Sequence, residues 1–339
     1  MTAFRTDRVT EVLEARRGLQ RLALESGERA YALTDVIGNV SIGDRVIINT
    51  TAVDLSLGTG GWHIVHWNLS LDQLSSKRPG HIMKVRYTSE QNASQSIEEM
   101  YPEPSVDLSQ RLASCKVLVA ALHSQVGVGA LAAHFVNPDL RIGYVMTDGA
   151  ALPIALSDMI YGFRECGVIS STVTAGQSFG GDYESLTPEA GVAGCFEHLA
   201  CDLVIVGMGP GIAGTGTQLG TTALECVGII NNLIAMGADV AFALRYSGAD
   251  ARSRHQGISH HSETIVRLVS HVTKIGIPAG QTVPAAMNMS TPVDVSAIME
   301  MLKQDTRTPR SMGRGVSDDP QFYEFTVASV LALLQSPAS

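Results

Sequence analysis

The sequence predicts an α/β protein in which a small all-β domain precedes a mainly parallel, Rossmann-like sheet with helices on both faces. Two patterns predict this class: short alternating apolar runs fill the first 90 residues, and strand–loop–helix repeats begin near residue 108. Of the 339 residues, 45% are hydrophobic and only 17% are charged, which excludes an intrinsically disordered chain.

The N-terminal domain is expected over residues 1–90, as a small β-barrel or a sandwich. Glycine, asparagine and proline residues interrupt the chain about every ten residues, which is typical of short antiparallel strands joined by turns. The expected strands are Arg8–Leu13, Leu19–Glu25, Ala30–Leu33, Arg45–Thr50, Trp62–Leu69 and Ile82–Tyr87.

A polar stretch with Pro102 and Pro104 follows, and we interpret residues 91–107 as a linker. The second domain is expected over residues 108–339 as the Rossmann-like part with C-terminal helices. Its strands are nearly continuous apolar runs, as expected where helices cover both faces of a sheet. They are Lys116–Leu122, Ile142–Met146, Val168–Val173, Leu203–Val206 and Val240–Leu244.

Helices are expected between and after these strands. Thr187-Pro188 and Asp319-Pro320 each combine a capping residue with proline at the first helical position. Gly167 and Gly237 stand where helix-terminating glycines belong. The expected C-terminal helices are Glu263–Lys274, Val293–Asp305 and Pro320–Leu334.

Charge, targeting signals and composition limit which partners and which cellular location we expect. The formal net charge of −9 disfavours binding to nucleic acid or to an acidic membrane surface. The N-terminal residues lack the apolar stretch of a signal peptide, and the five cysteines form no CxxC pair, so we expect a cytoplasmic protein. The low charge content and glycine-rich helices further predict a homo-oligomer.

Ligands of open parallel sheets bind at the carboxyl ends of the strands. Most of the unusual polar residues of this chain follow predicted strands and should therefore meet at one edge. These residues are His123 after the first strand, Asp148 after the second, Gln177, Asp182 and Glu184 after the third, and the glycine and histidine segments after the fourth and fifth.

A glycine loop, GMGPGIAGTGTQLG, follows the fourth strand. It fits GxGxxG literally, but it lies late in the domain and no acidic residue ends the next strand, so an NAD(P) cofactor is disfavoured. Backbone approach and threonine hydroxyls instead favour binding of a phosphate, nucleotide or carboxylate, with a tightly packed structural loop as the alternative. The candidate ligand-binding residues are Gly209, Gly211, Gly214, Thr215, Gly216 and Thr217.

The segment RSRHQGISHH supplies Arg252, Arg254, His255, His260 and His261. Its histidines could act as metal ligands, acid–base groups or partners of a phosphate. The neighbouring arginines favour an anionic ligand, and the spacing matches no established metal motif. Asp148, Asp182 and Glu184 could add oxygen ligands to a divalent metal or serve as general base, or they could simply bond to backbone amides.

Four segments, GTGGWHIVHWNL, GHIMKVRYTSEQ, GMGPGIAGTGTQLG and RHQGISHH, occur in this order along the chain. With them the sequence resembles an uncharacterised bacterial family, a domain of unknown function. The resemblance covers most of the chain and implies no activity, cofactor or catalytic residue.

The residues favour an enzyme, a hydrolase or group transferase, that acts on a small anionic or phosphorylated metabolite at the carboxyl edge of the sheet, with nucleotides among the candidates. His255, His260, His261, Asp148, Asp182 and Glu184 are its candidate catalytic residues, and His123, Gln177, Arg252 and Arg254 add to the binding residues of the loop. The alternative is a non-catalytic metabolite sensor or an oligomeric assembly protein.

Overall fold

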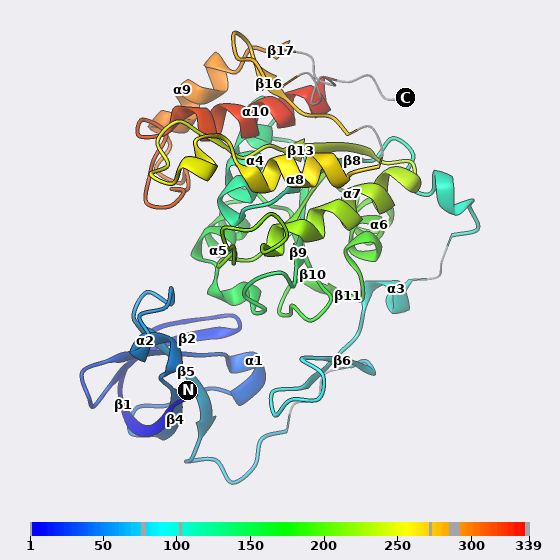
Figure 1. Ribbon diagram of the computed structural model, residues 1–339. Helices are drawn as coiled ribbons and strands as arrows, with labels where there is room; N and C mark the ends of the chain where they lie inside the picture. Colours follow the sequence, from blue (N-terminus) through cyan, green and yellow to red (C-terminus); the bar gives the residue numbers. More distant parts are fainter. Residues whose placement is uncertain (1, 76–78, 102–103, 271–272, 285–291, 336–339) are drawn as a thin grey trace. The chain divides into compact units, whose positions relative to one another are not determined.

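A computed structural model describes residues 2–75, 79–101, 104–270, 273–284 and 292–335 (Figure 1). The chain divides into two compact units, Met1–Gln95 and Ser96–Ser339. The segment that we expected to be a linker contributes β7 (Asn92–Ser94) to the first unit and α3 (Ile97–Met100) to the second. Ile97 is buried in the core of the second unit, and residues 102–103 lie outside the described residues.

The first unit is a closed barrel with the strand order β1-β2-β3-β5-β4, which confirms the predicted β-barrel. Its strands are β1 (Phe4–Arg16), β2 (Leu19–Leu24), β3 (Arg29–Ala32), β4 (Arg45–Asn49) and β5 (Trp62–Asn68), with the short helices α1 (Thr34–Ile37) and α2 (Thr51–Asp54). Alternate residues such as Val9, Leu22, Val46 and Ile48 fill the interior.

Two features of the barrel differ from the pattern expected. Register shifts within β1 let this long strand pair with both β2 and β4 and so close the barrel. The sixth predicted strand is not part of it, because β6 (Ile82–Lys84) pairs with β7 in a separate two-stranded sheet.

The second unit is built on an all-parallel sheet with the order β11-β10-β9-β12-β8-β13. Its strands are β8 (Lys116–Ala120), β9 (Ile142–Thr147), β10 (Ser171–Ala175), β11 (Tyr183–Ser185), β12 (Leu203–Met208) and β13 (Asp239–Ala243). The five predicted strands are present, and β11 adds a sixth at one edge. In order of appearance the strands run 4-3-2-5-1-6, whereas dinucleotide-binding domains usually run 3-2-1-4-5-6.

Helices cover both faces of this sheet. One face packs against α4 (His123–Val136), α5 (Asp158–Glu165), α9 (Ser296–Gln304) and α10 (Pro320–Leu334). The other packs against α6 (Pro188–Glu197), α7 (Glu225–Ala235) and α8 (His260–Leu268) (Figure 1). The 3-10 turns η1 (Leu108–Gln110), η2 (Ile154–Leu156), η3 (Thr222–Leu224) and η4 (Ser253–His255) and the short strands β14 (Tyr246–Ser247), β15 (Gly257–Ile258), β16 (Ile277–Pro278) and β17 (Pro292–Val293) complete the unit.

The predicted helix boundaries agree with the structure where a capping residue, a proline or a glycine marks the end of the helix. Thr187 accepts a hydrogen bond from the Ala190 N–H at the start of α6, and α10 begins at Pro320. Gly167 and Gly237 have φ angles of +75° and +90° just after α5 and α7, where a side chain would be strained. In contrast, α8 spans His260–Leu268 rather than beginning at Glu263, and residues 271–272 of the predicted helix lie outside the described residues. None of the described helices combines the length and apolarity that crossing a bilayer requires.

Close packing between backbones makes a testable contrast between two glycines. A Cβ added to Gly276 would overlap the backbone of Ala328 and Ser329 in α10, whereas a Cβ on Gly228 in α7 meets nothing within 4 Å. We expect Gly276→Ala to lower the free energy of unfolding by about 1–3 kcal/mol, as overpacking does. Gly228→Ala should raise it by about 0.5–1 kcal/mol through helix propensity. Denaturant unfolding of both variants measures this, and equal stabilities would contradict the packing described.

Candidate functional site

The strand order determines where the connections diverge at the carboxyl edge of the parallel sheet. β12 lies between β8 and β9, but the helix that follows β12 covers the opposite face from the helices that follow its two neighbours. The connections therefore diverge at this edge, which is where open parallel sheets bind ligands. The loops after β9 and β12 meet there, because the Ala151 N–H donates to the Pro210 carbonyl at 3.1 Å.

The glycine loop after β12 folds back on itself. Gly214 pairs with Thr221, and the Thr215 N–H donates to the Gly220 carbonyl at 2.6 Å. The hydroxyls of Thr215 and Thr217 bond to each other at 2.8 Å and accept backbone N–H groups of the loop. These two hydroxyls are thus engaged within the loop, and Gly211, Gly214 and Gly216 are its candidate amide donors.

Gly209 has a packing role. A Cβ at this position would lie 2.8 Å from the Ala151 carbonyl oxygen, so only glycine lets the loops after β9 and β12 approach each other. The alternative of a tightly packed structural loop therefore describes this end of the glycine segment.

Three histidines, which we call the imidazole cluster, gather beside this loop. His255 ends η4, and His260 and His261 begin α8. One ring nitrogen of each lies within 4.8 Å of those of the other two. The ring centroids of His260 and His261 are 3.9 Å apart, and that of His255 is 5.1 and 5.3 Å from them.

Burial and positive charge keep the imidazole cluster neutral at physiological pH. Burial, followed by the Arg245 charge, lowers the pKa of His255 to about 3. Burial and the neighbouring His260 lower the pKa of His261 to about 4. Burial, followed by the Arg254 charge, also lowers the pKa of His260. Neutral imidazoles have free lone pairs, which act as proton acceptors or metal ligands.

The glycine loop and the imidazole cluster are in contact. A Cβ added to Gly214 would lie 2.9 Å from Cε1 of His261. The Thr215 backbone also lies close enough to the His261 ring to offset part of the fall in its pKa. Three residues predicted from two separate sequence segments are thus brought together.

The two predicted arginines have different surroundings. Arg252 donates two hydrogen bonds to Asp250, both at 3.0 Å, and Asp250 also accepts from Arg245 at 2.9 Å. The hydrogen bonds from Arg252 hold the pKa of the Asp250 carboxyl well below its usual range. Arg252 is therefore engaged in an ion pair, whereas Arg254 is exposed and near enough to His260 to lower its pKa.

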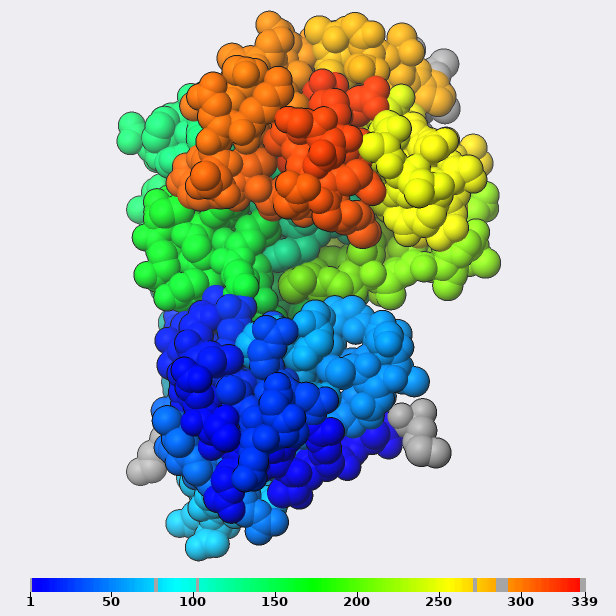
Figure 2. Space-filling view, turned by 90° about the vertical axis from the view of Figure 1, so that its left-hand side faces the viewer, coloured from blue at the N-terminus to red at the C-terminus, as the bar shows by residue number. Residues whose placement is uncertain are grey.

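The segment that carries this cluster is anchored to the C-terminal part of the chain. Ser247 donates to Asp319 at 2.6 Å, and Arg314 pairs with both Asp319 and Asp250. In the space-filling view, the yellow segment near residue 255 lies next to the orange-red segment near residue 315 (Figure 2).

A pair of carboxylates forms a second polar group at the same edge. Asp148 follows β9 and accepts the Gln177 N–H at 2.9 Å, which brings these two predicted residues together. Glu225, the first residue of α7, accepts a 2.5 Å hydrogen bond from the Thr147 hydroxyl. Burial raises the pKa of Glu225, the Thr147 hydrogen bond lowers it and the Asp148 charge raises it, and the net pKa is about 7.

Sequence reasoning missed Glu225. The pattern Thr222-x-x-Glu225 directly after the glycine loop resembles a helix start and could have pointed to an acidic residue at this edge. Its raised pKa could not be read from the sequence, because the shift comes from burial and from a neighbour on a different strand.

Asp182 and Glu184 are held away from the imidazole cluster by local bonds. Asp182 accepts the backbone N–H and the hydroxyl of Thr172, both at 3.0 Å, and pairs with Arg164 at 2.9 Å. Glu184 accepts the Thr174 hydroxyl at 2.6 Å and the Gly180 N–H at 2.8 Å. Within the described residues, the one group of three or more histidine, cysteine or acidic side chains spaced to hold a metal is the imidazole cluster.

His123 is fixed at the start of α4. Its Nδ1 lies 3.1 Å from the Met208 carbonyl, and its Nε2 lies 2.7 Å from the Ser157 hydroxyl. Because a carbonyl only accepts, Nδ1 carries the proton and Nε2 accepts from Ser157. Burial lowers the pKa of His123 to about 4. Ser157, which the sequence did not single out, also caps α5 by accepting the Ile160 N–H.

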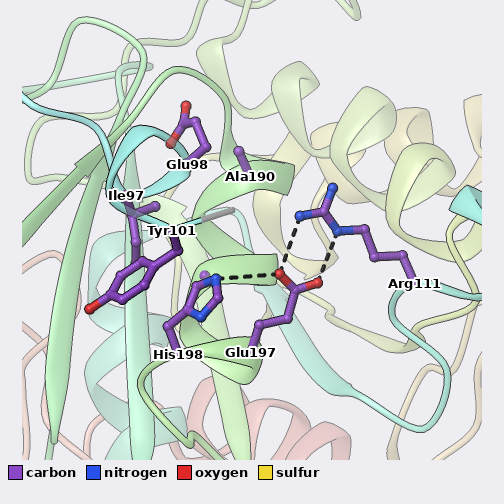
Figure 3. Close-up of a pocket in the computed structure, with 8 residues that line it drawn as sticks. Ile97, Glu98, Tyr101, Arg111, Ala190, Glu197 and His198 are labelled. Atoms are coloured by element: carbon purple, nitrogen blue, oxygen red, sulfur yellow. Dashed lines mark hydrogen bonds and ion pairs between the residues drawn. The ribbon is translucent and has the colours of Figure 1, made fainter. Parts of the chain in front are cut away.

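A cavity of about 360 Å³ lies along α6, and none of the predicted site residues line it. Its polar residues already bind one another: Arg111 forms two hydrogen bonds with Glu197, and Tyr101 stacks on His198 with ring centroids 4.0 Å apart (Figure 3). The cavity has the volume of a small-molecule site, but four of its polar side chains pair with each other. Glu98 is the exception: its Oε1 accepts the Leu186 N–H, and its Oε2 is buried without a partner among the described residues.

Comparison with known families gives one match. A family model described as a protein of unknown function, DUF3866, matches residues 29–330, which is most of the chain. Neither a curated protein nor a solved structure matches this chain.

The raised pKa of Glu225 makes the stability of the protein pH-dependent. The folded pKa of about 7 exceeds the ordinary value of 4.5, so the folded state binds more protons between these two values. This contribution is fully present below pH 4.5 and is lost as the pH rises through 7. We expect Glu225→Gln to flatten the fall in unfolding free energy over this range, as measured by urea unfolding. The control is Glu165→Gln, an exposed position on α5, which should keep the wild-type slope. A wild-type slope in Glu225→Gln would refute the assignment.

Proposed function

The chain belongs to this family of unknown function, and we propose that it is a hydrolase or group transferase that acts on a small anionic or phosphorylated metabolite. The metabolite would bind at the carboxyl edge of the parallel sheet, beside β12. From the family resemblance we expect a bacterial enzyme, and from its composition we expect it to act in the cytoplasm as a homo-oligomer.

One observation carries this proposal: the glycine loop lies against the imidazole cluster and leads into the helix that begins with Glu225. Gly214 lies against His261 and pairs with Thr221, which is four residues before Glu225. η3, between Thr221 and Glu225, also packs against α8. Amide donors, imidazoles and a carboxyl group with a pKa near 7 therefore belong to one loop and to the two helices next to it.

The residues have distinct roles in this proposal. Backbone amides of Gly211, Gly214 and Gly216 would bind the anion, and the exposed Arg254 guanidinium would add a forked donor. Glu225 would act as general base, taking the proton from the attacking water or acceptor hydroxyl while the leaving group departs from the opposite side. Such a group contributes roughly 10²–10⁴-fold to the rate, and it works best when its pKa is near the operating pH.

Hydride transfer with NAD(P) is not part of the proposal. We regard the sheet as Rossmann-like in the broad sense of a parallel sheet covered on both faces. Its strand order is not the usual dinucleotide-binding order, and Leu244-Arg245 follow β13 where a ribose-binding acid would be expected.

Anion binding can be tested by thermal unfolding of the purified protein with inorganic phosphate, nucleotides and sugar phosphates, with and without Mg²⁺. A specific ligand at 100 times its Kd stabilises by about 2.7 kcal/mol and raises Tm accordingly. Arg254→Gln should weaken binding at least about tenfold, or about 1.4 kcal/mol. Arg267→Gln, an exposed arginine on α8, is the matched control and should bind normally. If no anion raises Tm, the proposal fails.

Catalysis is tested separately from binding, with whichever phosphate ester stabilises the protein. We expect Glu225→Gln to bind this ester but to release phosphate about 10²–10⁴-fold more slowly than wild type. Ester that binds to the wild type without any turnover would contradict an enzyme and favour the metabolite sensor.

A further inference from the structure

We propose that His255, His260 and His261 form a binding site for a divalent transition-metal ion of the Zn²⁺ class. The inference goes beyond the proposed function and does not depend on it. It rests on where the ring nitrogens lie, on their missing partners and on what orients one of the rings.

The three ring nitrogens are close to metal-binding spacing. They all lie within 4.8 Å of one another. Three imidazole nitrogens on a tetrahedral Zn²⁺, at about 2.0–2.1 Å from the metal, would be about 3.3 Å apart. Small rotations of the rings therefore suffice to place the three lone pairs on one ion.

Two of these rings bury a nitrogen that nothing else in the described residues satisfies. Nε2 of His260 and Nε2 of His261 are buried without a hydrogen-bond partner there. The His261 side chain is 94% buried, with 6% of its surface exposed. A buried unsatisfied polar atom costs about 1–3 kcal/mol, so two of them side by side call for an occupant. A metal ion would accept both lone pairs.

One ring is held as in metal sites. Nδ1 of His255 lies 2.8 Å from the Ser259 hydroxyl. Histidines that bind metals are usually oriented in this way by a partner on their second nitrogen. Ser259 thus orients the His255 ring, while Nε2 of His260 and Nε2 of His261 have no partner among the described residues.

The charges of nearby residues determine which kind of fourth ligand a Zn²⁺ ion bound by the three histidines would favour. Arg245 pairs with Asp250 at 2.9 Å, which offsets much of its repulsion of a cation. Arg254 is exposed and adjacent. Its charge favours an anion as the fourth ligand, either hydroxide or the anionic group of a metabolite. Only the suggestion that a metabolite supplies this fourth ligand rests on the proposed function.

The test is metal binding by the full chain after chelator treatment. Calorimetric titration with Zn²⁺ should show one ion per chain, and Co²⁺ should give the visible absorption of a tetrahedral site. His255→Ala, His260→Ala and His261→Ala should each lower the affinity at least about tenfold. The control is His134→Ala near the end of α4, beside Asp305 and Arg307 and outside the cluster, which should bind like wild type.

Substitution of Gly214 offers a second test in which no histidine is replaced. Gly214→Ala would put a Cβ 2.9 Å from Cε1 of His261 and should displace that ring. Gly216→Ala, in the same loop, meets nothing within 4 Å. Weaker Zn²⁺ binding in the first variant and wild-type binding in the second are expected.

Several results would overturn the inference. These are the absence of Zn²⁺ and Co²⁺ binding, or wild-type affinity in all three alanine variants. Circular dichroism identifies any variant that fails to fold, and His→Gln substitutions then replace the alanines. Because no phosphate, nucleotide or sugar phosphate is added in these titrations, Zn²⁺ binding without any rise in Tm from those anions would refute the proposed function and leave the metal site standing.

Discussion

β12 is hydrogen-bonded between β8 and β9, and this pairing decides where the polar residues of the second unit meet. A parallel neighbour on each side brings the carboxyl ends of the three strands to one edge. The chain leaves β12 toward one face while its neighbours lead to the other, so the connections diverge at this edge. His123, Glu225 and the glycine loop all begin from these strand ends. A different strand order would separate them without changing a single local motif.

Within this frame, glycines determine how closely the loops approach. Gly209 lets the loop after β12 pass the Ala151 carbonyl, and Gly214 lets the same loop lie on His261. Side chains at these positions would push the loop away from the β9 connection and from the cluster. The glycine content of the loop therefore has a packing cause at these positions, in addition to any part in binding an anion.

The sequence predicted the features that depend on local patterns. Apolar runs located the five strands, and Pro320 marked the first residue of the last helix because its ring fits only there. Features that depend on distant partners escaped it. The raised pKa of Glu225 arises from burial and from Asp148 on another strand. For Asp182 the sequence left a site role and a bond to backbone amides open, and only the structure identifies its partners as Thr172 and Arg164. The strand order itself could not be read from local periodicity, because residues far apart in the chain set it.

The electrostatics of the carboxyl edge run against those of the chain as a whole. The formal net charge is −9, but around the imidazole cluster Asp250 and Asp319 pair with three guanidinium groups, and Arg254 adds a fourth. The excess of positive charge is confined to the surroundings of this cluster, since Asp148 and Glu225 place two carboxyl groups at the same edge. Positive charge near Arg254 favours small anions, while the acidic remainder of the surface repels polyanions such as nucleic acid. This contrast, rather than any single motif, supports the proposal that a small anionic metabolite binds at this edge.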